Sequence, residues 1–347
     1  MTDGAPAGPP CLPTVGIVVN PAAGKDIRRL VAAASPTSDM AKVGIVRRAV
    51  VGAVEGGARR VLLTDDRRAL SARAIDRLEV DAELDLLPAP PWDVSANSTA
   101  AAAALRDIEA GAVVVLGGDG THRDVVKGWR DAVLVALSTG TNNVFPRHHE
   151  ATMAGHAAGA VASGVAPVAS VAWRAKLLDV EIEGAQAGRD LALVDLALVE
   201  GAFTGSRAVW EAGRLLDLVA VIAEEASVGL SAVAARLHPV GRRDPGAVHV
   251  RFGSGGQTIR VPMAPGLYAD VAVRAACPLH LGRVIELGGP GVLSFDGERD
   301  VVLGPEDRAV VTVAGDGPQV IDVEAAMAVA LASDRDATGL TRLTGES

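Results

Sequence analysis

The first half of the chain alternates short apolar runs with longer stretches in which apolar residues recur at helical spacing. The apolar runs predict strands at residues 15–19, 61–64, 112–116 and 132–137, and a weaker run predicts a strand at 83–87. The stretches between them predict helices over residues 42–55, 68–77, 98–110 and 150–162. For the helix at 98–110 we expect Asn97 or Ser98 as the N-cap. This alternation predicts an α/β, Rossmann-like domain with a parallel sheet over residues 14–165.

After residue 164 the pattern changes to short apolar runs separated by turn residues, which is typical of a β-rich domain. Strands are predicted at residues 171–182, 191–199, 248–252, 258–262, 268–274, 284–287 and 292–295, and a helix is predicted at 205–223. We therefore expect a β-rich second domain over residues 166–309. Strands at 310–313 and 319–323 and a helix at 324–332 end the chain. We expect residues 310–347 to return toward the first domain.

Composition narrows the class of protein. The 347 residues are 49% apolar but only 3% aromatic, so the core must consist of Ala, Val and Leu. A net charge of −9 argues against nucleic acid as a partner. The two cysteines, Cys11 and Cys277, form neither a disulfide framework nor a metal cluster. Residues 1–13 are expected to be a disordered tail, and no apolar run is long enough to span a membrane. We expect a cytoplasmic protein without membrane partners.

The most informative segment follows the predicted strand at 112–116. It is a glycine-rich loop with one carboxylate and one hydroxyl, formed by Gly117, Gly118, Asp119, Gly120 and Thr121. Its glycines let a backbone approach a phosphate closely, and Thr121 is expected to cap the next helix. A carboxylate in such a loop needs a cation beside it or a proton to accept, so Asp119 indicates Mg²⁺ or general-base chemistry.

Two further loops are expected at the same sheet edge. One follows the strand at 132–137 and consists of Ser138, Thr139, Gly140, Thr141, Asn142 and Asn143. The other follows the first strand and contains Asn20, Gly24 and Lys25, which favour either phosphate binding or an ordinary Asn-Pro turn. Because ligands of open α/β sheets bind outside the carboxyl ends of parallel strands, the three loops predict a nucleotide-phosphate site.

Other polar residues are open to more than one interpretation. Asp296 and Glu298 flank Gly297, and this segment suits both a type I′ hairpin turn and an acidic contribution to the site. Next to the glycine-rich loop, Arg123 is a better candidate for phosphate contact than His122, because arginine stays charged. The adjacent His148 and His149 lack metal-ligand spacing and predict a polar start of a helix.

These motifs resemble those of the superfamily of NAD kinases, diacylglycerol kinases and sphingosine kinases. The strings NPAAGKDIRRL (residues 20–30) and STGTNNVFP (residues 138–146) are most similar to its ATP-NAD kinase-like branch, the acetoin-catabolism X proteins. The resemblance covers nearly the whole chain. It implies a Rossmann-like domain followed by a β-rich domain, with the active site between them.

The resemblance also implies a chemistry: an ATP-dependent kinase that uses Mg²⁺ and phosphorylates NAD to NADP at the adenosine ribose 2′-hydroxyl. Asp119 is then the catalytic acid/base and a Mg²⁺ contact, and Asp195, Asp296 and Glu298 lie on the substrate side. Val194 departs from the family pattern, since NAD kinases carry there an Asn that contacts the dinucleotide. A homo-oligomer, dimeric or tetrameric, is implied as well.

Alternatives to an NAD kinase remain at this stage. The acceptor is either NAD, another small hydroxylated metabolite or a lipid alcohol, and the lipid is less favoured because no basic amphipathic helix is present. A catalytically silent regulatory protein that binds NAD or ATP would also keep the glycine loops and lose substrate contacts. A dehydrogenase is disfavoured, because no Gly-x-Gly-x-x-Gly sequence follows the first strand.

Overall fold

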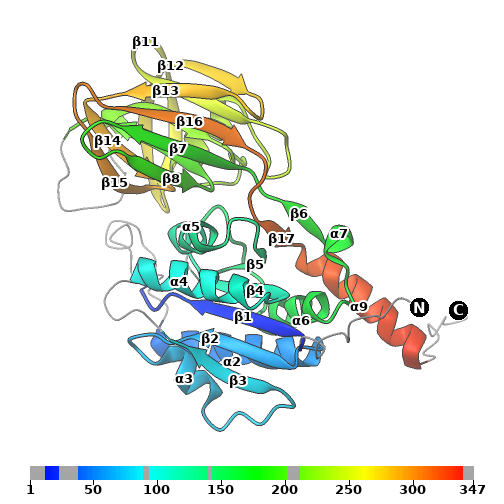
Figure 1. Cartoon of the computed structure of the whole chain (residues 1–347). Coiled ribbons are helices and arrows are strands. Elements are labelled where there is room, and N and C mark those ends of the chain that lie inside the picture. The colour runs from blue at the N-terminus through cyan, green and yellow to red at the C-terminus, as the bar shows by residue number, and fades with distance from the viewer. Residues whose placement is uncertain (1–11, 23–37, 89–93, 140–142, 202–211, 339–347) are drawn as a thin grey trace, which may run out of the picture.

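The structure is a computed structural model, which describes residues 12–22, 38–88, 94–139, 143–201 and 212–338. It contains a seven-stranded sheet flanked by helices and, beyond it, a six-stranded and a four-stranded sheet (Figure 1). Gly24, Lys25, Gly140, Thr141 and Asn142 lie outside the described residues.

The seven-stranded sheet has the order β3-β2-β1-β4-β5-β17-β6. All neighbouring strands in it are parallel except β17 and β6. Its strands are β1 (Thr14–Val19), β2 (Arg60–Thr64), β3 (Glu83–Leu87), β4 (Ala112–Gly117), β5 (Val133–Ser138), β6 (Ala172–Arg174) and β17 (Gln319–Ile321). The five strands predicted in the first half of the chain are therefore confirmed, as is their parallel arrangement.

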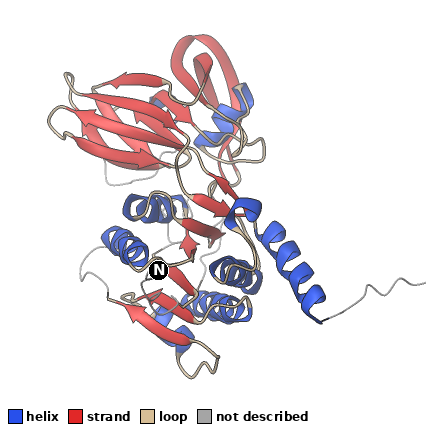
Figure 2. Ribbon diagram, turned by 45° about the vertical axis from the view of Figure 1, so that its right-hand side comes forward, coloured by secondary structure: helices blue, strands red, loops and turns tan. Residues whose placement is uncertain are grey.

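Helices cover both faces of this sheet (Figure 2). They are α2 (Asp39–Glu55), α3 (Leu70–Ile75), α4 (Val94–Asp107), α5 (Asp119–Gly128), α6 (Ala151–Ala162), α7 (Val168–Val171) and α9 (Val323–Thr338). One buried cluster packs α2, α3, α6 and α9 against one face. Another packs α4 and α5 against the other face and continues into the β-rich domain, so the two domains share one core.

Glycines allow α2 and α6 to approach unusually closely. Gly52 of α2 and Gly56, its C-cap, face Gly155 and Gly159 of α6, and a Cβ at any of the four would collide with backbone atoms of the opposite helix or its cap. Small residues at this spacing let helix backbones approach each other, and dispersion between the backbones replaces side-chain packing. The chain has few aromatic residues, and at this interface close packing of the two helices takes the place of packing by large side chains.

The β-rich domain consists of two antiparallel sheets. The six-stranded sheet has the order β12-β11-β10-β9-β14-β15, and the four-stranded sheet has the order β13-β16-β7-β8. The strands are β7 (Leu177–Glu183), β8 (Gly188–Ala192), β9 (Asp195–Val199), β10 (Leu215–Ala220), β11 (Ala247–Ala264), β12 (Leu267–Leu279), β13 (Val284–Gly288), β14 (Gly291–Phe295), β15 (Glu298–Leu303) and β16 (Arg308–Ala314). A 3₁₀ turn (Ala212–Arg214) and helix α8 (Leu230–Leu237) complete it.

Several element predictions were wrong. The strand predicted over 171–182 is divided between β6 and β7, and the strand predicted over 191–199 is divided between β8 and β9, with each pair in two different sheets. The helix predicted to start at residue 98 already covers Val94, so Asn97 and Ser98 lie inside it and are not its N-cap: Asn97 donates to the Asp65 carbonyl at 3.0 Å, and Ser98 is buried. The helix predicted over 205–223 includes the strand β10, which pairs with β9 and β11. A continuous apolar run does not distinguish a buried strand from a helix.

The parallel sheet extends beyond the domain boundary expected near residue 165. Strand β6 follows that boundary, yet it pairs with β17 inside the seven-stranded sheet. The chain passes into the β-rich domain after Arg174 and returns to the parallel sheet at β17. None of the helices in the described part of the chain is both long and apolar enough to cross a membrane.

Candidate functional site

The carboxyl ends of β1, β4 and β5 lie side by side, and each continues into one of the predicted loops. Val19 pairs with Leu116, and Gly117 pairs with Ser138, so Asn20, Asp119 and Thr139 follow neighbouring strands on one edge of the sheet. The prediction that the two glycine-rich loops follow adjacent parallel strands is confirmed.

Helix α5 begins at Asp119, with Gly118 as its N-cap in an extended conformation. The prediction that Thr121 caps this helix was wrong, because the helix begins two residues earlier and Thr121 lies in its first turn. The Thr121 hydroxyl instead accepts a hydrogen bond from Asn20 Nδ2 at 2.8 Å. A side chain at Gly117 would collide with Thr121. The loops after β1 and β4 are therefore tied together by side chains.

Asp119 joins the glycine-rich loop to the loop after β5. Its carboxylate is only 9% exposed. It accepts hydrogen bonds from the Val144 N–H, 3.1 Å from each oxygen, and from the Phe145 N–H at 2.8 Å. A negative charge in the first turn of a helix is also favoured by the helix dipole. Two backbone amides thus hold the carboxylate of Asp119, the predicted general base, in one orientation.

The remaining described residues of the loop after β5 bond to each other and to β4. Asn143 Nδ2 donates to Ser138 Oγ at 2.9 Å, and the Thr139 N–H donates to the Gly117 carbonyl at 3.4 Å. A Cβ on Gly118 would lie 2.9 Å from Asn143 Oδ1, so this glycine lets the two loops approach. The structure brings Ser138, Thr139 and Asn143 next to the glycine-rich loop.

The β-rich domain reaches this loop through the hairpin of β14 and β15. Phe295 pairs with Glu298, and Asp296 and Gly297 between them both have positive φ, which confirms the predicted type I′ turn. Glu298 lies at the start of α5, since a Cβ on Gly120 would be 3.5 Å from Glu298 Oε1. The hairpin therefore places an acidic side chain beside the loop that contains Asp119.

Asp296 turns away from that loop and binds backbone. Its carboxylate accepts from the N–H groups of Leu193 at 3.0 Å, Val194 at 2.8 Å and Asp195 at 3.3 Å. Burial raises the pKa of Asp296, whereas the charge of Arg123 and these N–H bonds act to lower it. Asp296 connects the hairpin to the junction of β8 and β9. Its contact with a substrate, and that of Asp195, stay predictions.

Val194 is 1% exposed and belongs to the core shared by the two domains. Its backbone is fully used: the N–H donates to Asp296, and the carbonyl accepts from the Val221 N–H at 2.9 Å. The resemblance to NAD kinases implies an Asn at this position, whose amide contacts the dinucleotide. In this chain the position holds the buried aliphatic side chain of Val194.

Arg123 and His122, which follow the glycine-rich loop, are both buried. The Arg123 guanidinium lies over the Phe295 ring, 5.0 Å from its centroid, donates to the Phe295 carbonyl at 3.3 Å and lies 3.6 Å from Asp190. It thus joins α5 to the β-rich domain, and its contact with phosphate stays a prediction.

Burial lowers the pKa of His122 to about 4. Nδ1 lies 2.8 Å from the Gly118 carbonyl, so the neutral ring carries its hydrogen there. Within the described residues, Nε2 has no hydrogen-bond partner. His122 is therefore a neutral packing residue beneath the loop, against the Phe145 ring.

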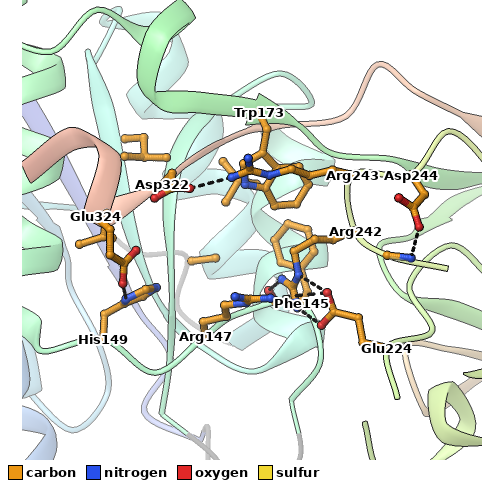
Figure 3. Close-up of a pocket in the computed structure, with 15 residues that line it drawn as sticks. Phe145, Arg147, His149, Trp173, Glu224, Arg242, Arg243, Asp244, Asp322 and Glu324 are labelled. Carbon is orange, nitrogen blue, oxygen red and sulfur yellow. Dashed lines mark hydrogen bonds and ion pairs between the residues drawn. The ribbon is translucent and has the colours of Figure 1, made fainter. Parts of the chain in front are cut away.

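A cavity of about 450 Å³ lies at the seam between the domains, at the carboxyl ends of β5 and β17. We call it the seam cavity. Phe145, Trp173, Arg147, Arg242 and Arg243 line it together with acidic side chains (Figure 3). Asp119 is not among its lining residues, so the seam cavity adjoins the segment that holds Asp119 without containing the carboxylate.

Sequence reasoning missed Arg242 and Glu224. Arg242 donates to the carbonyls of Val144 and Phe145, each at 2.9 Å. Both Glu224 oxygens accept from it at 2.9 Å (Figure 3). Hydrogen bonding from Arg242 lowers the pKa of Glu224. The two residues lie in turns without any motif, and no spacing in the sequence relates them to Asp119.

Among the described residues, no group of three or more His, Cys, Asp or Glu side chains is placed to hold a metal ion. Mg²⁺ usually binds through one or two carboxylates together with water and substrate phosphates. Asp119 is one such carboxylate, and Glu298, whose Oε1 would lie 3.5 Å from a Cβ on Gly120, is a second one near the start of α5.

A family model for the acetoin catabolism protein X C-terminal domain matches residues 176–316. Acetoin catabolism protein X of Cupriavidus necator is 36% identical over 340 residues, which span 94% of this chain and 95% of that relative. The chain belongs to the acetoin catabolism protein X family. The family predicted from the motifs at residues 20–30 and 138–146 is thereby confirmed.

Solved structures extend the likeness to kinases. Yeast NADH kinase complexed with NADH has a TM-score of 0.53 and 13% identity, covering 98% of this chain and 95% of that chain. A diacylglycerol kinase from Bacillus anthracis str. Sterne has a TM-score of 0.42 and 12% identity, covering 89% and 97%. At such identities the likeness shows the fold alone. The predicted NAD kinase-like fold, a Rossmann-like domain followed by a β-rich domain, is confirmed by the first of these.

Proposed function

We propose that this member of the acetoin catabolism protein X family is an ATP-dependent kinase that transfers the γ-phosphoryl group to a hydroxyl of a small molecule. The observation that carries the proposal is the position of Asp119. Its carboxylate lies at the start of α5, on the carboxyl edge of the parallel sheet, and is oriented by the amides of Val144 and Phe145. Phosphoryl transfer depends mostly on positioning and on electrostatic stabilisation.

In the proposed reaction the acceptor hydroxyl lies within hydrogen-bond distance of Asp119. The carboxylate takes the hydroxyl proton as the new oxygen–phosphorus bond forms, and ADP leaves with the electrons of the broken bond. Backbone N–H groups at the start of α5 face the phosphates. Mg²⁺, held by Asp119 and Glu298, would offset the charge of the phosphate oxygens.

NAD is the first candidate acceptor, phosphorylated to NADP at the adenosine ribose 2′-hydroxyl. It is supported by the motif resemblance and by the fold shared with a kinase of NADH. The buried Val194 favours a second candidate, a different small hydroxylated metabolite, because a valine supplies no amide to a dinucleotide. Membership of the acetoin catabolism protein X family decides neither acceptor.

The test incubates the full-length protein with ATP, Mg²⁺ and NAD and follows ADP release and NADP formation. Asp119→Asn is the test variant, and Asp107→Asn, a solvent-exposed acid with its side chain 65% exposed, is the matched control. We expect about a 10³-fold loss of turnover in Asp119→Asn, of the order seen when a transition-state contact is lost, and less than a twofold change in the control.

The outcomes separate the candidates. Formation of NADP that Asp119→Asn abolishes supports the NAD kinase. ADP release with another alcohol and not with NAD removes NAD and retains the kinase. Binding of ATP without phosphoryl transfer to NAD or to any of a panel of alcohols contradicts the kinase proposal and favours a nucleotide-binding regulatory protein.

A further inference from the structure

The segment Val144–Phe145 lies outside every strand, so no sheet ladder fixes it. Both of its N–H groups donate to Asp119, and both of its carbonyls accept from Arg242. Two side chains from two different domains thus hold the same two residues, and both bind the peptide unit between Val144 and Phe145. Any movement of the segment on the Arg242 side must change how its N–H groups meet the Asp119 carboxylate.

Arg242 is well suited to hold these carbonyls. Its side chain is 12% exposed, and a planar guanidinium can donate to several acceptors in a fixed geometry. Nη1 binds the Phe145 carbonyl and Nη2 the Val144 carbonyl, while Nε and Nη2 both bind Glu224. Glu224 follows β10, so a residue of the β-rich domain orients the guanidinium that binds the Val144 and Phe145 carbonyls.

We propose that Arg242, oriented by Glu224, is a positioning residue that fixes the catalytic geometry of Asp119 through the Val144–Phe145 segment. This rests on the proposed function, because it assigns the kinase site a control element in the second domain. Lysine at this position would keep the charge but lose the planar guanidinium that binds two carbonyls and both Glu224 oxygens in a fixed geometry, and glutamine would lose both the charge and the ion pair with Glu224.

Arg243 provides a matched control on the next residue. It lines the same seam cavity, but it pairs with Asp322 at 2.7 Å and lies over Trp173, 5.7 Å from the ring centroid (Figure 3). Its side chain is 59% exposed. Arg243→Gln therefore removes the same charge from the same cavity, and its ion pair lies away from the Val144–Phe145 segment.

The experiment compares Arg242→Gln, Arg242→Lys and Arg243→Gln in the full-length protein, with two readouts. The first is hydrogen exchange of the backbone amides in peptides covering residues 143–149. The second is ATP-dependent phosphoryl transfer, with kcat and the KM for ATP determined separately. Thermal unfolding identifies any variant that fails to fold, and Arg242→Lys, which keeps the charge, provides the second variant if Arg242→Gln is lost.

For both Arg242 variants we expect amide exchange at residues 144 and 145 to accelerate at least about tenfold. We expect kcat to fall about 10- to 100-fold, as displacement of a catalytic group by about 1 Å does, with the KM for ATP changed less than about threefold. Arg243→Gln should stay within about twofold of wild type in both readouts.

Two results overturn the inference: unchanged exchange at residues 144 and 145 in the Arg242 variants, or an equal loss of kcat in Arg243→Gln. If the wild-type protein transfers no phosphoryl group, the proposed function fails and the exchange readout remains decisive. Faster exchange then still establishes that Arg242 holds the segment bound by Asp119, and unchanged exchange contradicts it.

Discussion

In the α/β domain, the candidate site residues follow the ends of parallel strands and would act through their own side chains. In the β-rich domain, Arg242 and Asp296 reach the same region and bind backbone groups of loops. Asp119 belongs to the first kind, since its residue type and loop suggest its role in the proposed kinase. Arg242 belongs to the second kind, since its proposed role depends on the carbonyls that it binds. The comparison teaches that the proposed base and the arginine that holds its supporting segment come from different domains.

The largest effect that separates these roles is expected at Asp296. Asp296→Ala removes the acceptor of the buried N–H groups of Leu193, Val194 and Asp195. A buried polar group without a partner costs about 1–3 kcal/mol, so this variant should lower the free energy of unfolding by about 3 kcal/mol. Asp296→Asn, which keeps one acceptor, should lose about half as much. Urea unfolding measures both.

Activity of the Asp296 variants then sharpens the comparison. If Asp296 supports structure, kcat of folded Asp296→Asn should fall less than about tenfold. Normal stability with abolished turnover in this variant would show that Asp296 itself acts in the reaction, and its assignment as a supporting residue would be wrong.

A second prediction concerns the helix pair of the α/β domain. In Gly155→Ala the new Cβ meets the backbone of α2 at Ala49, and overpacking of this kind should cost about 2 kcal/mol. Gly44→Ala is the matched control, because a Cβ at this α2 glycine meets only the end of the Arg48 side chain. It should stabilise by up to about 1 kcal/mol. Equal effects of the two substitutions in urea unfolding would contradict the close-packed interface.

Third, His122 should make the protein acid-sensitive. Its native pKa is about 4, against 6.5 for an unperturbed histidine, so the unfolded state binds more protons between these values. Stability from the neutral ring is complete above pH 6.5 and is lost as the pH falls toward 4. Between pH 7 and pH 5 the loss should be about 2 kcal/mol.

The test of this prediction is urea unfolding at pH 7 and pH 5 for the wild type and for His122→Phe and His122→Gln. Whatever each substitution costs at pH 7, the additional loss on acidification should be about 2 kcal/mol smaller in both variants. An identical pH dependence in wild type and variants would show that His122 is not buried neutral beneath the loop.

The smallest effect is expected at the start of α6. Glu150 accepts from the N–H groups of Thr152 and Met153 and caps the helix, so Glu150→Ala should cost about 1 kcal/mol. Arg48 pairs with Glu150 at 2.8 Å, but both side chains are half exposed, and Arg48→Ala should cost less than about 0.5 kcal/mol. A larger loss for Arg48→Ala would assign the stability to the ion pair rather than the cap.

The sequence allowed most of the α/β domain to be predicted, because each of its strands is an apolar run followed by a loop with a recognisable composition. Asp119 could be identified as a candidate site residue because it lies between glycines, in a loop whose composition favours phosphate binding. The strand Leu215–Ala220 could not be predicted, because an apolar run of this length is as typical of a helix as of a buried strand.

The supporting contacts could not be predicted for a different reason. Arg242 lies in a short basic turn that looks like exposed surface, and Arg243 beside it is indeed largely exposed. Only the three-dimensional return of the chain from β10 and α8 brings Arg242 to the carbonyls of Val144 and Phe145. A contact from a side chain to backbone carbonyls far away in the sequence, such as this one, leaves no pattern of residue type or spacing.

The most direct test of the central claim, that Arg242 acts through Asp119, is the kcat of the double variant Asp119→Asn, Arg242→Gln against the two single variants. Residues that act as one unit show losses that do not add. We predict that the double variant has the same residual kcat as Asp119→Asn alone, within about threefold. A further 10- to 100-fold drop in the double variant, equal to the effect of Arg242→Gln in the wild-type background, would contradict the claim.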